Sequence, residues 1–108
     1  MQLNEYQQRS KRTLNTDLIM EDQLTNYCLG VAGEAGEVAD IIKKAIYHGH
    51  VLSPDKIIEE LGDVLFYVAA IASTLHINLD EIAEKNVEKL LRRYPEGFSQ
   101  KASRERAE

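Results

Sequence analysis

Two short acidic segments of this sequence repeat one pattern of carboxylates around a glycine. Glu34 and Glu37 stand in the segment EAGEV, and Glu60 and Asp63 stand in the segment ELGDV. Each segment lies within an apolar repeat of helical period, and residues three positions apart share one face of a helix. Two such helices packed together would bring four carboxylates close to one another. Like charges at that density repel, and divalent cations with oxygen ligands relieve the repulsion.

This acidic pattern predicts phosphate chemistry. Protein-bound Mg²⁺ keeps several waters and takes further ligands from substrate phosphates. Two ions could hold the attacking and leaving oxygens and activate a bound water. Glu59, next to Glu60 in the sequence, could orient that water or accept its proton, or it could be an ordinary solvated residue.

The acidic segments are weak evidence singly and stronger together. A single E-x-x-E is common on solvated helix faces, whereas here Glu34 and Glu60 fall at the same edge of two neighbouring apolar stripes. Gly36 and Gly62 lie inside the two acid pairs, and a glycine within a helix costs roughly 1 kcal/mol relative to alanine. The paired glycines indicate close approach of backbone or ligand beside the acids, unless both arose by neutral drift.

The rest of the sequence predicts the helices that position these acids. Ser53 and Pro54 are typical of a helix start, the segment around Gly49 of a helix end, and Asn78 with Glu81 of a capping-box-like start. No alternating strand pattern is sustained. The predicted fold class is all-α, a helical bundle of about four main helices. Their expected ranges are about 2–14, 21–47, 54–76 and 79–93.

Length and composition bound the architecture. The 108 residues are 44% hydrophobic and contain no Trp, which predicts one domain with a mostly aliphatic core. We expect this domain at residues 1–98, followed by a polar, flexible tail at 99–108. The single cysteine, Cys28, excludes an intramolecular disulfide and a thiolate metal cluster, and we expect it to pack in the core.

Charge and hydropathy exclude some functions. The net charge of −5 argues against nucleic-acid binding as the main function. Basic residues gather in the last quarter of the chain, where they could form a local anion-binding surface or an ordinary solvated charge run. The N-terminus lacks a signal-peptide stretch, and no apolar run is long enough to span a membrane. We therefore expect a soluble, cytoplasmic protein without membrane contact.

Several polar residues beyond the acids could contact a substrate. Asn86, Lys89 and Arg93 share one face of the last helix, offering an amide and two cations to a polyphosphate, or forming a solvated basic face near a helix C-terminus. Lys44 has the same two interpretations. Tyr67, one turn beyond Asp63, could stack on a base or close the core.

The motifs in this order resemble the MazG-like nucleotide pyrophosphohydrolases of the all-α NTP pyrophosphatase superfamily, over roughly residues 24–98. The matching blocks are GEAGEV with the lysine pair that follows it, EELGDVLFY, and N-x-x-K-L-x-x-R-Y-P. The resemblance implies hydrolysis of a nucleoside triphosphate to the monophosphate and pyrophosphate. Mg²⁺, or Mn²⁺ as a substitute, would be held by Glu34, Glu37, Glu60 and Asp63.

The same resemblance extends to substrate contacts and assembly. It implies substrate binding by five further residues, namely Lys44, Tyr67, Asn86, Lys89 and Arg93. It also implies a homodimer or homotetramer of single-module chains, in which helices from two subunits build each active site and oligomerisation completes the bundle. House-cleaning of non-standard nucleotides is a hypothesis that rests on this likeness alone.

Two other function classes stay open from the sequence. A non-catalytic helical module could bind metal, nucleotide or a protein partner through its acidic groove. A plain oligomerisation bundle is the third interpretation. Acids facing a separate amide and lysine set favour the enzyme, because a scaffold needs no such opposed sets.

Overall fold

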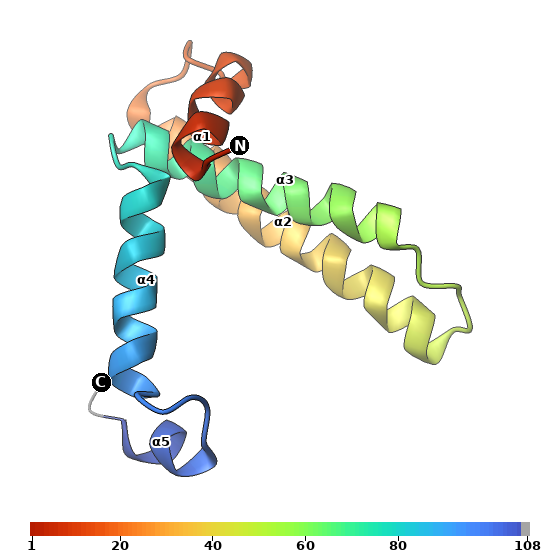
Figure 1. The fold of residues 1–108 in the computed structure, drawn as a ribbon. Helices are drawn as coiled ribbons and strands as arrows, with labels where there is room; N and C mark the ends of the chain where they lie inside the picture. Colours follow the sequence, from red (N-terminus) through yellow and green to blue (C-terminus); the bar gives the residue numbers. More distant parts are fainter. Residues whose placement is uncertain (107–108) are drawn as a thin grey trace.

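A long antiparallel helical hairpin dominates the structure. The computed structural model describes residues 1–106, and Figure 1 shows α2 and α3 side by side, with α1 across one end and α4 leaving from that same end. A 3₁₀ turn at Lys11–Thr13 follows α1. The α-helices of the described part are α1 (Leu3–Ser10), α2 (Met20–Tyr47), α3 (Pro54–Thr74), α4 (Leu79–Arg93) and α5 (Gln100–Glu105).

The predicted all-α fold is confirmed, with small changes at helix ends. The first helix is shorter than expected and passes into the 3₁₀ turn after Ser10. The third ends at Thr74 instead of residue 76, because His76 adopts a left-handed φ of 58° and cannot continue the helix. The N–H of Ile77 then donates to the Ala72 carbonyl at 2.8 Å, which closes that helix end.

The loop between α2 and α3 follows the local sequence signals. Gly49 takes a left-handed φ of 72°, and the N–H of His50 donates to the Lys44 carbonyl at 3.1 Å. Ser53 then caps α3 by accepting a hydrogen bond from the backbone N–H of Lys56 at 3.5 Å. These contacts turn the chain back and set α3 antiparallel to α2.

The two long helices approach closely at Gly30, a position that the sequence analysis did not single out. A Cβ there would overlap the Tyr67 ring, which also contacts the rings of Tyr27 and Phe66. At Gly36 and Gly62, by contrast, no described atom outside the neighbouring residues and backbone of the same helix lies within 4 Å of where a Cβ would stand. The close backbone approach expected beside the acids is therefore not made within one chain.

The buried core of the described chain is small. Its apolar members are Tyr27, three alanines of α3 and Leu79. Many large apolar side chains remain exposed, among them Leu29, Ile46, Leu61 and Leu91. The hairpin leaves the outer faces of both long helices uncovered, so each apolar stripe is only partly buried.

Cys28 lies on such an uncovered face of α2. The expectation that it packs in the core is wrong, because it is exposed in the chain. Periodicity alone places a residue on a helix but does not say which faces the neighbouring helices cover. No helix among the described residues is long and apolar enough to cross a membrane.

The start of α4 is capped by α1 and not by its own N-cap residue. Asn78 stands at the N-cap as expected, but its side chain accepts no capping hydrogen bond. Instead the N–H of Leu79 donates to Oε1 of Gln7 at 2.8 Å, and the N–H of Asp80 donates to Oδ1 of Asn4 at 3.1 Å. Side chains of α1 therefore satisfy donors at the start of α4.

Gln7 also binds the end of α3. Its Nε2 donates to the Ile77 carbonyl at 2.8 Å and to Oγ of Ser73 at 3.2 Å, and the residue is only 2% exposed. One buried amide thus joins three helices. It fixes where α4 leaves the hairpin, a link between distant segments that local sequence patterns do not reveal.

The C-terminal segment contains a helix that the sequence analysis did not predict. Ser99 caps α5 by accepting a hydrogen bond from the N–H of Ala102 at 2.9 Å. Phe98 contacts the ring of Tyr94 at the end of α4, with ring centroids 5.5 Å apart. The rest of the expected tail, residues 107–108, lies outside the described residues.

Replacing the buried amide tests its role in joining the helices. Gln7→Met keeps the approximate shape but leaves the Leu79 N–H and the Ile77 carbonyl without their partners, so we expect a loss of about 2–3 kcal/mol in the free energy of unfolding. Chemical denaturation measures this loss. Gln8→Met, at the exposed neighbouring position, is the matched control. Equal stability of the two variants would show that the amide does not join these helices.

Candidate metal centre

Three of the four predicted carboxylates converge across the hairpin. One oxygen each from Glu34 on α2 and from Glu60 and Asp63 on α3 lies within 4.8 Å of the others. Oxygens bound to one Mg²⁺ are at most about 4.2 Å apart, so small side-chain rotations would allow all three to bind the same ion. Glu34 and Glu60 are half-buried, whereas Asp63 is exposed. The cluster is therefore open to a ligand from solvent.

The protonation of Glu60 reflects this crowding. A hydrogen bond with Glu34, burial, and the negative charges of Glu34 and Asp63 all raise the pKa of Glu60 above its ordinary value. A hydrogen bond between two carboxyl groups needs a proton on one of them. A divalent cation could replace that proton, since it compensates the charge of both groups.

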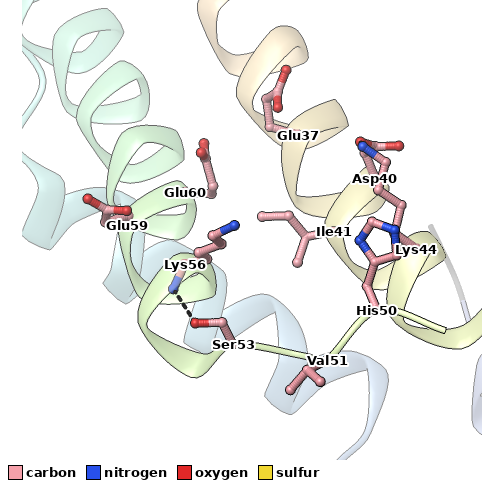
Figure 2. A pocket seen from close by; sticks show the side chains of 10 residues that line it. All are labelled: Glu37, Asp40, Ile41, Lys44, His50, Val51, Ser53, Lys56, Glu59 and Glu60. Carbon is pink, nitrogen blue, oxygen red and sulfur yellow. Dashed lines mark hydrogen bonds and ion pairs between the residues drawn. The ribbon is translucent and has the colours of Figure 1, made fainter. Parts of the chain in front are cut away.

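Glu37 and Glu59 lie beside the cluster in an adjoining hollow. This hollow, of about 390 Å³, is lined by Glu37, Asp40, Ile41, Lys44, His50, Val51, Ser53, Lys56, Glu59 and Glu60. Figure 2 shows Glu37 on α2 and Glu60 on α3 near the same end of it. Glu37 is thus outside the group of three converging oxygens but within the same region, where it could complete the ligand set of a second ion or bind through water.

Lys44 reaches the hollow but is already paired. Its ammonium lies 2.9 Å from Asp40, and Lys43 lies 3.3 Å from the same carboxylate. Hydrogen bonds from Lys44 and Lys43 lower the pKa of Asp40, and the hydrogen bond to Asp40 raises the pKa of Lys44. Asp40 was not among the residues predicted from the sequence, although its spacing to the two lysines is the helical i,i+3 and i,i+4 pattern of ion pairs.

Tyr67 lies half-buried within the hairpin. Its ring fills the space beside Gly30 and contacts the ring of Tyr27, with centroids 6.4 Å apart and an interplanar angle of 40°. Of the two interpretations from the sequence, the structure gives direct support to core packing. Contact with a base stays a prediction.

The predicted substrate contacts on α4 are not gathered at the acids of the same chain. Asn86, Lys89 and Arg93 belong to α4, which packs mainly on α1 and then extends away from the hairpin (Figure 1). The acidic cluster lies partway along α2 and α3. A single chain therefore presents the two predicted halves of a site on separate parts of its surface.

Comparison with known proteins identifies the family. A sequence profile of the MazG nucleotide pyrophosphohydrolase domain matches residues 22–98, which include both acidic segments and all of α4. The chain belongs to the MazG nucleotide pyrophosphohydrolase family. The resemblance seen in the sequence over roughly residues 24–98 is thereby confirmed.

One relative of this MazG chain is the Gene 37 protein of Mycobacterium phage L5. The two sequences are 35% identical over 81 residues, and the match covers 71% of this chain and 71% of that protein. That relative's name describes no activity. No solved structure gives a significant match to the chain.

The raised pKa of Glu60 makes stability depend on pH. Since the pKa of Glu60 is raised above its ordinary value of 4.5, the folded state binds this proton more tightly than the unfolded chain. The stabilisation is present below that value and is lost as pH rises through the folded-state pKa. In chelator, we expect the melting temperature of the wild type to fall more than that of Glu60→Gln between about pH 5 and pH 8.

Thermal melts across this pH range measure the difference. Glu21→Gln, an exposed substitution in the first turn of α2, is the control and should follow the wild type. Mg²⁺ should reduce the pH dependence of the wild type because it replaces the proton. Parallel curves for wild type and Glu60→Gln would contradict a raised pKa of Glu60 in the folded state.

Proposed function

We propose that this MazG domain hydrolyses a nucleoside triphosphate to the monophosphate and pyrophosphate, using Mg²⁺ or, as a substitute, Mn²⁺. The observation that carries the proposal is the convergence of Glu34, Glu60 and Asp63 across the hairpin, beside a hollow that also contains Glu37. Four carboxylates are a suitable ligand set for hard cations that recruit phosphates. Family membership supports the reaction class.

The chemistry divides between the ion and the chain. Mg²⁺, when bound, would polarise a phosphate oxygen and lower the pKa of a bound water. Glu59 lines the hollow next to the ligand Glu60, where its carboxylate could orient the attacking water and accept its proton. The carboxylates of the lining would repel a bare polyphosphate until cations compensate them, so the substrate would enter as its metal complex.

We further propose that the active form is a homodimer or homotetramer. Exposed apolar side chains on the outer faces of α2 and α3 and the small core of the single chain support an interface. In such an assembly, α4 of one subunit would bring Asn86, Lys89 and Arg93 to the acids of another. An amide and two cations would then face the phosphates from the side opposite to the carboxylates.

Four further expectations come from the sequence and from the resemblance to the family. Discrimination among bases and sugars, house-cleaning of non-standard nucleotides and a cytoplasmic location remain predictions. So does base stacking on Tyr67. The rival interpretation is a non-catalytic module that binds metal, nucleotide or a protein through the acidic groove. Assays of pyrophosphate release distinguish this module from the enzyme.

Pyrophosphate release from a panel of ordinary and modified nucleoside triphosphates tests the reaction. We expect release with Mg²⁺ and none with chelator, and a loss of roughly hundredfold or more in Glu60→Gln and Glu37→Gln, because the ligands that hold transition-state charge are weakened. Glu21→Gln should keep full activity. A folded protein that binds Mg²⁺ but releases no pyrophosphate from any substrate would favour the non-catalytic module.

Mixing inactive variants tests the shared site. Glu60→Gln and Lys89→Met should each be inactive alone, and subunit exchange between them should restore part of the activity, because some sites then combine intact acids with an intact lysine. Glu60→Gln mixed with Asp63→Asn is the matched control and should stay inactive, since both changes affect the acidic side. Failure of the first mixture after demonstrated exchange would argue that no site is shared between subunits.

A further inference from the structure

A second hollow lies at the end of the hairpin opposite to the loop between α2 and α3. It has a volume of about 350 Å³ and forms where the segment between α1 and α2 meets the end of α3, at the end that α1 crosses (Figure 1). We call it the junction hollow. Among the residues that line it are Lys11, Leu14, Thr16, Met20, Ser73 and His76.

The junction hollow is separate from the acidic cluster. Ser73 lies about 15 Å beyond Asp63 along the axis of α3. No residue lines both this hollow and the one beside Glu60. A ligand in the junction hollow would therefore occupy its own site.

The charge of the junction hollow is opposite to that of the acidic cluster. Lys11 and His76 line it, and no carboxylate from residues 1–106 does. The ammonium of Lys11 forms no ion pair within that part of the chain, so an anion would not have to displace a carboxylate from it. In a chain with a net charge of −5, such a hollow is a local place for negative charge.

Two hydroxyl groups of the junction hollow have protons to donate. Oγ of Ser73 accepts a hydrogen bond from Nε2 of Gln7 at 3.2 Å, and its own O–H donates to no acceptor in the described residues. The hydroxyl of Thr16 makes no hydrogen bond within the same residues. With the ammonium of Lys11 and an imidazole N–H of His76, these hydroxyls form a set of four donors, which suits the acceptor oxygens of a phosphate.

The backbone of His76 is fixed at the edge of this hollow. Its φ of 58° lies in the left-handed region, which few residues other than glycine adopt. The N–H of His76 donates to the Ser73 carbonyl at 3.2 Å, and the N–H of Ile77 donates to the Ala72 carbonyl at 2.8 Å. Uncommon backbone conformations held by surrounding contacts are frequent at ligand sites.

The junction hollow shares Ser73 with the contacts that join α1, α3 and α4. Gln7 donates to Oγ of Ser73, and its Oε1 accepts the N–H of Leu79 at 2.8 Å. A ligand that accepts the Ser73 proton would strengthen this series, because hydrogen bonds in a chain polarise one another. Lys11 directly follows α1, so the same ligand would also tie α1 to the end of α3.

We propose that the junction hollow is a second binding site, for the phosphate group of a small phosphomonoester. The four donors would bind the phosphate oxygens, and Leu14 and Met20 would contact the apolar part of the ligand. The volume is within the range of small-molecule sites. Bound ligand would stabilise the contacts from which α4 leaves the hairpin. The site needs no metal ion and does not depend on the proposed hydrolysis.

Calorimetry with a nucleoside monophosphate in chelator tests this site, because without cations the carboxylates of the acidic cluster repel phosphate. We expect Lys11→Met to weaken binding roughly ten- to hundredfold, as for the loss of one charge-assisted hydrogen bond. His76→Gly, which suits the left-handed backbone, should weaken it as well. Inorganic phosphate should bind less tightly than the monophosphate, since it makes no apolar contact.

Two variants serve as controls for the calorimetry. Arg12→Met removes the same charge from the next residue of the 3₁₀ turn, which does not line the hollow, and should keep the affinity. Glu60→Gln should keep it too. Equal weakening by Lys11→Met and Arg12→Met, or loss of binding in Glu60→Gln, would overturn the site, as would a wild type that binds no monophosphate at millimolar concentration.

Hydrogen exchange provides a second readout. Bound monophosphate should slow exchange of the Leu79 amide proton, because that amide donates to Gln7, the partner of Ser73. Unchanged exchange at saturation would overturn the effect on the contacts between α1, α3 and α4. Equal affinities for the monophosphate and inorganic phosphate would overturn the phosphomonoester as ligand in favour of the phosphate ion.

Discussion

The packing of α2 against α3 is the interaction on which the rest of this structure depends. Tyr67 fills the space beside Gly30, and the small side chain there lets the two helices approach closely enough to face each other along their length. The same packing brings Glu34 against Glu60 and Asp63. Apolar and aromatic contacts thus hold together a group of like charges that would otherwise separate, and the electrostatic cost appears as the raised pKa of Glu60.

That cost makes the acidic cluster a place where stability and ligand binding are linked. The hydrogen bond with Glu34 and the neighbouring negative charges raise the pKa of Glu60, and a cation bound between the two carboxylates would compensate the same charge. A few residues further along α2, Asp40 is compensated by two lysines of its own helix and needs no external partner. The carboxylates of Glu34 and Glu60 therefore form a site suited to a cation, whereas Asp40 forms an ion pair on the surface of its own helix.

A second constraint acts at the other end of the hairpin. The buried amide of Gln7 satisfies backbone groups at the end of α3 and the start of α4, so α1 determines how the chain leaves the hairpin. Because α4 carries Lys89 and its neighbours away from the acids of the same chain, the two halves of the proposed site are separated by this junction. The large apolar surface left on the hairpin is consistent with their meeting through a second copy.

Local signals in the sequence determined the two long helices, the loop between them and the candidate ligands. Apolar periodicity, Ser53 before Pro54 and the glycine loop act over a few residues, so they suffice to place the carboxylates on α2 and α3. The family was also readable from the order of the motifs. Only the tertiary structure decided which carboxylates converge, that Gly30 and not Gly36 permits the close approach, and that Gln7 caps α4. It likewise left Cys28 exposed. The reason is physical: these outcomes depend on contacts between segments far apart in the chain, and on which helix faces find a neighbour, neither of which spacing along one helix encodes.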